Sequence, residues 1–151
     1  MKKLSEPAVQ REIMSRLASV SSEDRALWGK MSSHQMLCHL NDAYLFSLGR
    51  RSVAELKAPL PKAVFKLLAL RVPLRWPRGF TAPPEIAQEQ GGTAPGQFEQ
   101  DRAALLASVN EFCTNLPQHC LRHPYFGKMT ADDWMRWGYL HADHHLRQFD
   151  R

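Results

Sequence analysis

The chain has 151 residues, of which 44% are hydrophobic and 23% are charged, a composition that is ordinary for a globular protein. Lysine and arginine exceed aspartate and glutamate by 20 to 15, and this net charge of +5 is scattered along the chain. We therefore expect a single domain over residues 1–151 and no nucleic-acid partner, since nucleic-acid binding requires concentrated positive charge.

The cysteines and the apolar runs indicate a cellular compartment. Cys38, Cys113 and Cys120 share no C-x-x-C spacing, which argues against a disulfide framework and against a zinc ribbon. No apolar core of a signal peptide follows Met1, and the longest apolar run, residues 67–70, is far too short to cross a bilayer. We expect a cytoplasmic protein with no membrane partner.

The first two helices are predicted by apolar spacing. Pro7 suits the opening turn of the first helix, whose apolar positions recur every four residues at Val9, Ile13 and Leu17. The second helix is predicted from about residue 33 to residue 48, where Gly49 ends it.

Two similar phrases, WGKMS and FGKMT, mark the start of the second helix and of the last one. Each phrase ends in a hydroxyl residue that can cap a helix, Ser32 or Thr130. Three residues further on, Gln35 or Asp133 can complete or imitate a capping box. Both helix starts are therefore predicted from the capping residues beside them in the sequence.

Another long helix is predicted at residues 97–115, with Pro117 beyond its end. Between it and the second helix, residues 61–70 resemble a short helix, and residues 73–96 are rich in proline and glycine. Four long helices with this excursion predict an all-α four-helix bundle with a long crossover connection between helices 2 and 3.

The histidines of the last helix, residues 130–149, share one side with its tryptophans. At about 100° per residue, His145 lies ~40° from His141, and both Trp134 and Trp137 fall within ~60° of His141. Because His141 and His145 are one turn apart, their imidazoles can reach one metal ion at ~2.0–2.1 Å. The spacing predicts a metal-binding pair on the buried side of this helix.

A third ligand has to come from another helix. The second helix offers His34, in its first turn and near solvent, and His39, which lies ~40° from Ala43 on the apolar side. A histidine in the middle of an apolar helix face needs either a hydrogen-bond partner or a metal. His39 is the better candidate, although a histidine satisfied within the core fits the same pattern.

Three further residues could support the site. Gln148 lies ~20° from His141 and could orient a ligand or a bound water. Asp42 lies ~60° from His39 and could do the same, but a solvated helix residue is the favoured interpretation. His144 lies ~60° from His141, on the side away from His145. It could be an alternative ligand, a proton carrier or an edge residue that packs on the crossover.

The remaining histidines and the crossover carry weaker predictions. His34, His119 and His123 are expected on the surface or in loops, and Cys38 is expected to be structural because it points ~100° away from His39. Trp76 and Phe80 of the crossover could form a lid over the metal or pin the loop to the helices. The neighbouring Arg75 and Arg78 could receive an anionic thiol.

The phrases MSSHQMLCHLNDA and WMRWGYLHADHHLRQF are the most distinctive in the chain. Shorter motifs accompany them, namely WGKM at 28–31, PLP at 59–61, WP at 76–77, GGT at 91–93, HPYFGKM at 123–129 and HADHHLRQF at 141–149. In combination they resemble the DinB/YfiT-like superfamily of bacterial metalloenzymes, over nearly the whole chain.

The resemblance implies a helical bundle that holds a divalent metal, most often nickel or zinc, with three histidines. The H-L-x-D motif of the family corresponds to His39, and its H-x-x-x-H motif corresponds to His141 and His145. Some members of the superfamily transfer low-molecular-weight thiols such as bacillithiol or mycothiol to electrophiles, or isomerise a substrate with a thiol. Other members are classed as hydrolases.

Three interpretations of function follow. The leading one is a metal-dependent enzyme that resembles an S-transferase and uses a small-molecule substrate and a low-molecular-weight thiol, with a metal-dependent hydrolase as the nearest alternative. The second is a non-catalytic helical protein in which any metal only stabilises the bundle. The third is a module that forms a homodimer in a stress response through exposed apolar helix faces.

Overall fold

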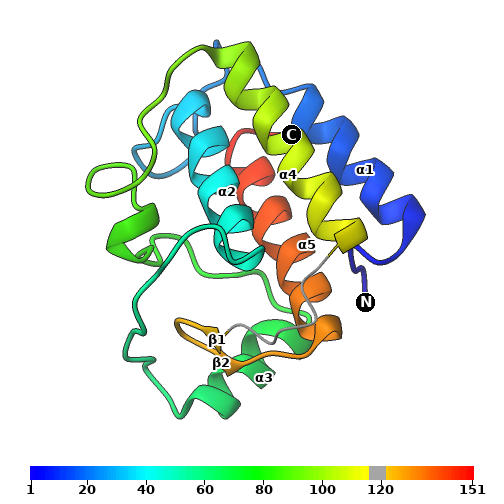
Figure 1. The fold of residues 1–151 in the computed structure, drawn as a ribbon, viewed down its shortest axis with the longest axis vertical. Coiled ribbons are helices and arrows are strands. Elements are labelled where there is room, and N and C mark those ends of the chain that lie inside the picture. The colour runs from blue at the N-terminus through cyan, green and yellow to red at the C-terminus, as the bar shows by residue number, and fades with distance from the viewer. Residues whose placement is uncertain (116–121) are drawn as a thin grey trace.

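The computed structural model describes residues 1–115 and 122–151, whose regular structure is almost entirely helical (Figure 1). The helices are α1 (Pro7–Ala18), α2 (Ser33–Ser47), α3 (Lys62–Arg71), α4 (Phe98–Asn115) and α5 (Ala131–Gln148), with a 3₁₀ turn η1 (Pro84–Ile86). Two short strands, β1 (Arg122–His123) and β2 (Gly127–Lys128), pair antiparallel just before α5. The prediction of a helical fold is confirmed.

Both predicted capping boxes are present. The side chain of Ser32 accepts a hydrogen bond from the backbone N–H of Gln35, and the Gln35 side chain accepts one from the backbone N–H of Ser32. Thr130 and Asp133 make the same reciprocal pair at the start of α5. These caps satisfy N–H groups that have no partner inside a helix, so both helix starts are set by local sequence.

The four longest of the described helices pack side by side (Figure 1). Both α1 and α2 contact α4 and α5, and the core lies between them. On α5, Gly138 allows this close packing, because a Cβ atom there would lie 2.8 Å from Cε1 of Phe112. The hydroxyl of Tyr44 in α2 donates to the Gly138 carbonyl at 2.9 Å. The first contact packs α5 on α4, and the second joins α2 to α5 close to the histidines.

The segment between α2 and α4, residues 48–97, contains α3 and η1. Helix α3 contacts α5, and η1 contacts α2. This segment therefore covers the side of the helices on which α2 and α5 meet, and it supplies one wall of the site described below.

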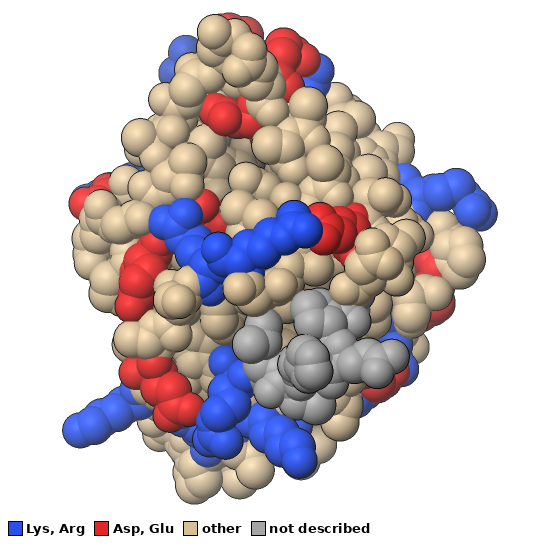
Figure 2. Space-filling view, viewed as in Figure 1, with Lys and Arg blue, Asp and Glu red and all other residues tan. Residues whose placement is uncertain are grey.

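The surface carries charges of both signs. On the face shown in Figure 2, lysine and arginine side chains lie beside aspartate and glutamate. Ion pairs among the surface side chains include Arg50 with Glu111 and Lys62 with Glu55. Among the helices in residues 1–115 and 122–151, none combines the length and the apolar character needed to cross a membrane.

Candidate metal centre

Helix α2 buries His39 and fixes the tautomer of its ring. The side chain is 4% exposed, and its Nδ1 lies 2.8 Å from the backbone carbonyl oxygen of Ile86 in η1. Because a carbonyl oxygen can only accept, Nδ1 carries the proton and donates it. The lone pair of the imidazole is therefore on Nε2, which faces α5 and can bind a metal.

Helix α5 presents His141 and His145 one turn apart, with ring centroids 5.0 Å from each other. The Nδ1 of His145 lies 3.0 Å from Oε1 of Gln148, whose Nε2 donates to the Trp28 carbonyl at 2.7 Å. Since that donation leaves Oε1 as the acceptor of the amide, His145 Nδ1 must donate to it. His145 therefore also has its lone pair on Nε2.

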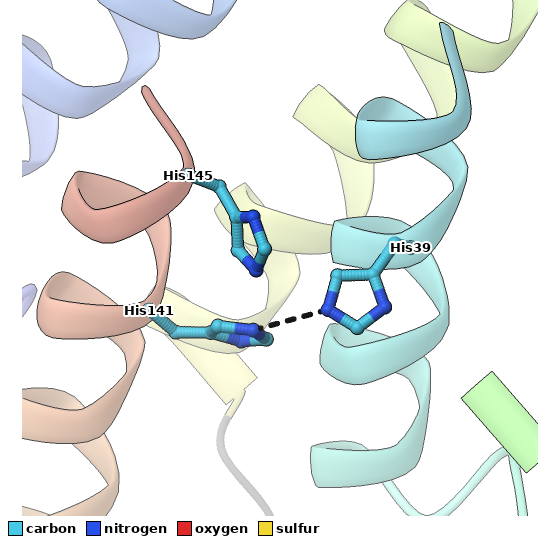
Figure 3. Close-up of side chains that lie close together, drawn as sticks. All are labelled: His39, His141 and His145. Atoms are coloured by element: carbon cyan, nitrogen blue, oxygen red, sulfur yellow. Dashed lines mark hydrogen bonds between the residues drawn. The ribbon is translucent and has the colours of Figure 1, made fainter. Parts of the chain in front are cut away.

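The three rings point toward one another across the α2–α5 contact (Figure 3). One nitrogen of each of the three imidazoles lies within 4.8 Å of the other two. The Nε2 atoms of His39 and His141 are 3.3 Å apart. Two nitrogens bound to one zinc ion at ~2.0–2.1 Å in tetrahedral geometry are separated by about 3.3–3.4 Å, so the spacing fits a shared ion.

His141 adds a second observation that fits a ligand. Its ring is buried, and its Nδ1 finds no hydrogen-bond partner among the described residues. A buried imidazole nitrogen without a protein partner is costly, and a bound ion, a water or a catalytic role is the usual explanation for one. The donor set is thus three imidazoles, a set that suits zinc, nickel and related ions.

The electrostatics of the site keep all three rings neutral. Burial lowers the pKa of His39 below its ordinary value. Burial also lowers the pKa of His141 and His145 well below that value, and the neighbouring histidines lower it further. Metal binding requires the neutral imidazole, so the rings are held in the state that can ligate without first losing a proton.

A cavity of about 690 Å³ opens beside the three histidines. Its wall is mostly apolar and includes Trp28, Phe65, Trp76, Phe80 and Tyr125. The Trp76 indole N–H donates to the Ala69 carbonyl at 2.9 Å, and its ring centroid lies 6.1 Å from that of His141. The crossover thus brings an aromatic ring against a candidate ligand, whereas Phe80 lies further out and is 48% exposed.

The three supporting candidates have different surroundings. Gln148 is buried and hydrogen-bonds His145, as described above. His144 is half-buried at the edge of the cavity, with ring centroids 6.0 Å from Trp28 and 6.2 Å from Trp76. It therefore packs on the crossover, next to the candidate ligands.

Asp42 is fully buried, so the favoured interpretation of a solvated residue is wrong. Its carboxylate accepts hydrogen bonds from the Arg51 guanidinium at 2.7 Å and from both the backbone N–H and the hydroxyl of Thr93. Arg51 in turn donates to the carbonyls of Glu85 and Gly91. Asp42 thus holds the segment that carries Ile86, whose carbonyl is the partner of His39. The position of Asp42 on the helix cannot reveal that Arg51 and Thr93 are its own hydrogen-bond partners.

The expected surface position of His123 is also wrong, whereas His34 lies in the first turn of α2 and keeps part of its side chain exposed. His123 lies in β1 and is 8% exposed, with its ring stacked on Phe126 at a centroid distance of 4.3 Å. His34 is half-buried, and its Nε2 lies 2.7 Å from a carboxylate oxygen of Asp101. His119 lies outside the described residues. The burial of His123 depends on neighbours from other parts of the chain, which periodicity does not encode.

The turn at Trp28 and Gly29 contributes to the site. From the sequence, this stretch was predicted only to mark the start of the second helix. Gly29 has a φ of +79°, and a Cβ atom there would lie 2.8 Å from Nε2 of Gln148. The glycine therefore lets the Trp28 carbonyl approach the amide that orients His145. The WGK phrase that precedes α2 was the available signal.

The fold and the site together define a helical protein with a buried three-histidine centre beside an apolar cavity. A family model described as the DinB superfamily matches residues 9–149. The chain belongs to the DinB superfamily, as its motifs predicted. Comparison with curated proteins and with solved structures gave no match.

Proposed function

We propose that this protein is a metal-dependent enzyme whose ion is held by His39, His141 and His145. The observation that carries the proposal is the convergence of three buried imidazoles on the wall of a cavity of about 690 Å³. A structural ion is normally enclosed by four protein ligands, whereas a catalytic ion has three and keeps a position open for water or substrate.

The architecture that supports this site is, in our proposal, a four-helix bundle formed by α1, α2, α4 and α5. Residues 48–97 are its long crossover connection, and residues 1–151 form one domain. Metal sites in such bundles are built from side chains on facing helices, and here α2 and α5 supply them.

The ligand set favours zinc or nickel, both of which bind imidazole well. When bound, such an ion lowers the pKa of a coordinated thiol or water to near neutral and so supplies a nucleophile. The Ile86 carbonyl and the Gln148 amide hold two of the imidazoles in the tautomer that leaves Nε2 free. Aromatic side chains form much of the cavity wall beside the three histidines.

The lining of the cavity indicates its substrates. Apolar and aromatic side chains predominate, which favours a small molecule with an apolar body. Lys30 and Arg75 also line the cavity and can pair with the carboxylate of a low-molecular-weight thiol. Transfer of such a thiol to an apolar electrophile is therefore the reaction best supported, and hydrolysis by water in place of the thiol is the alternative.

Metal analysis of untagged protein tests the ligand assignment. We expect His145→Ala to lose one equivalent of metal, and we expect the adjacent His144→Ala to retain it, since His144 faces Trp28 and Trp76 instead. Equal loss from both variants, or full retention in His145→Ala, would contradict the assignment.

A kinetic screen then tests the reaction. Apolar electrophiles are offered to the metal-loaded protein with bacillithiol, mycothiol or glutathione, and thiol consumption is followed. We expect turnover that His145→Ala abolishes. Hydrolysis without any thiol would instead identify the hydrolase alternative, and the absence of both reactions in protein with full metal content would indicate a structural ion.

A further inference from the structure

A second group of metal-binding side chains lies on another face of α2. It consists of His34, Cys38 and Asp101, here called the His34 cluster, and one donor atom of each residue lies within 4.8 Å of the other two. Cys38 is 3% exposed, and the His34 and Asp101 side chains are 20% and 26% exposed. None of the three belongs to the site proposed above.

Local structure brings the three donors together. His34 and Cys38 are four residues apart on α2, so their side chains are neighbours on one helix face. Asp101 lies in the first turn of α4, the helix that packs along α2. The periodicity that points Cys38 ~100° away from His39 turns it toward this second face. Two successive residues of α2 therefore face different clusters.

Neighbouring groups orient the donors of the His34 cluster. The Gly96 backbone N–H donates to Oδ2 of Asp101 at 2.8 Å, which fixes the carboxylate. The ring of Phe98 meets the His34 ring edge to face, with centroids 5.2 Å apart. His34 and Asp101 are also hydrogen-bonded to each other, since His34 Nε2 donates to Asp101 Oδ2 across 2.7 Å. An ion that binds both atoms replaces this hydrogen bond, so the two donors move apart by about 0.6 Å on binding.

We propose that the His34 cluster is a second metal site, for a thiophilic divalent cation of which Zn²⁺ is the best representative. Its nitrogen, sulfur and oxygen donors are those that zinc takes, at ~2.0–2.1, ~2.3 and ~2.0–2.2 Å. On binding, the Cys38 thiol releases its proton to solvent and the sulfur ligates as thiolate. The neutral His34 ring keeps one proton, which moves from Nε2 to Nδ1 so that Nε2 can ligate. The partial exposure of His34 and Asp101 leaves solvent access for a fourth ligand.

Cobalt(II) tests this proposal, because a thiolate bound to Co²⁺ gives a near-ultraviolet charge-transfer absorption that an all-histidine site cannot give. The protein used is the full chain with Cys113→Ser and Cys120→Ser, so that Cys38 is the remaining thiol. We expect the absorption to grow during titration with CoCl₂ and to saturate at one equivalent of thiolate-bound cobalt. Adding His145→Ala should leave it unchanged, which separates this site from the three-histidine site.

Two further variants decide the outcome. Cys38→Ser should abolish the absorption, and His34→Ala should weaken cobalt binding at least about tenfold, since even loss of an outer partner typically costs that much. Circular dichroism checks that each variant folds, and partly exposed His34 provides the variant least prone to misfold. Absence of the absorption in the starting protein, or unchanged cobalt affinity in folded His34→Ala, would overturn the proposal.

Discussion

Protonation of His123 should destabilise this fold. The ring is buried against Phe126, Trp134 and Trp137. Its Nδ1 accepts hydrogen bonds from the backbone N–H groups of Tyr125 at 3.2 Å and Phe126 at 3.4 Å. A proton on Nδ1 would face these two donors inside an apolar environment, so the folded state binds it poorly.

The size of the effect follows from the two pKa values of His123. Burial, with a smaller contribution from the positive charge of Lys62, lowers the pKa in the folded state to about 3 from an ordinary 6.5. The unfolded chain therefore takes up the proton first as the pH falls, and stability is lost from about pH 7 downward. Between pH 7.5 and pH 5, this linkage amounts to about 2 kcal/mol for His123 alone.

Urea denaturation followed by tryptophan fluorescence measures this loss at several pH values. The buried histidines of the metal centre also lose stability in acid, so the parent is compared with His123→Asn, which does not titrate. We expect the free energy of unfolding of the parent to fall by about 2 kcal/mol more than that of His123→Asn between pH 7.5 and pH 5. Parallel pH profiles for the two proteins would refute the assigned burial and acceptor role of this ring.

Three other substitutions probe the contacts around the metal centre. Gly29→Ala should displace the Gln148 amide and weaken metal binding by roughly tenfold, measured by competition with a chelator, with the secondary structure retained in circular dichroism. Arg51→Ala removes the charged partner of the buried Asp42 carboxylate and should lower the free energy of unfolding in urea by about 2–3 kcal/mol. Adding Asp42→Asn should restore part of this loss, because no unpaired charge is then buried. Gly138→Ala places a methyl group against a phenylalanine ring of α4, and a loss of about 1–3 kcal/mol is expected in the same assay.

The crossover, residues 48–97, contacts two of the candidate metal ligands. Its Ile86 carbonyl sets the tautomer of His39, and its Trp76 ring lies near His141. The segment is held in turn by an ion pair between Asp42, which lies within α2, and Arg51, which lies beyond the end of α2. Disturbing that ion pair should therefore change metal affinity as well as stability.

Local sequence was sufficient for the features that depend on helical geometry. The two residues of a capping box lie three positions apart in the sequence, so the starts of α2 and α5 could be predicted from Ser32 and Thr130. The four-residue spacing of His141 and His145 guarantees neighbouring side chains on any helix. The apolar side of α2 selected His39, because burial of one helix face follows a period of 3.6 residues.

Which groups meet across the chain depends on how the helices and the crossover pack. His39 and His141 are 102 positions apart, and their approach depends on how α2 packs against α5. The burial of Asp42 and His123 depends on a crossover and a hairpin that have no periodic pattern to read. Helical period is a property of neighbouring residues, whereas burial and most hydrogen-bond partners are set by segments distant in sequence. The candidate ligands and Gln148, which lies on the same helix as His145, could therefore be predicted from the sequence, but the Ile86 carbonyl that orients His39 could not.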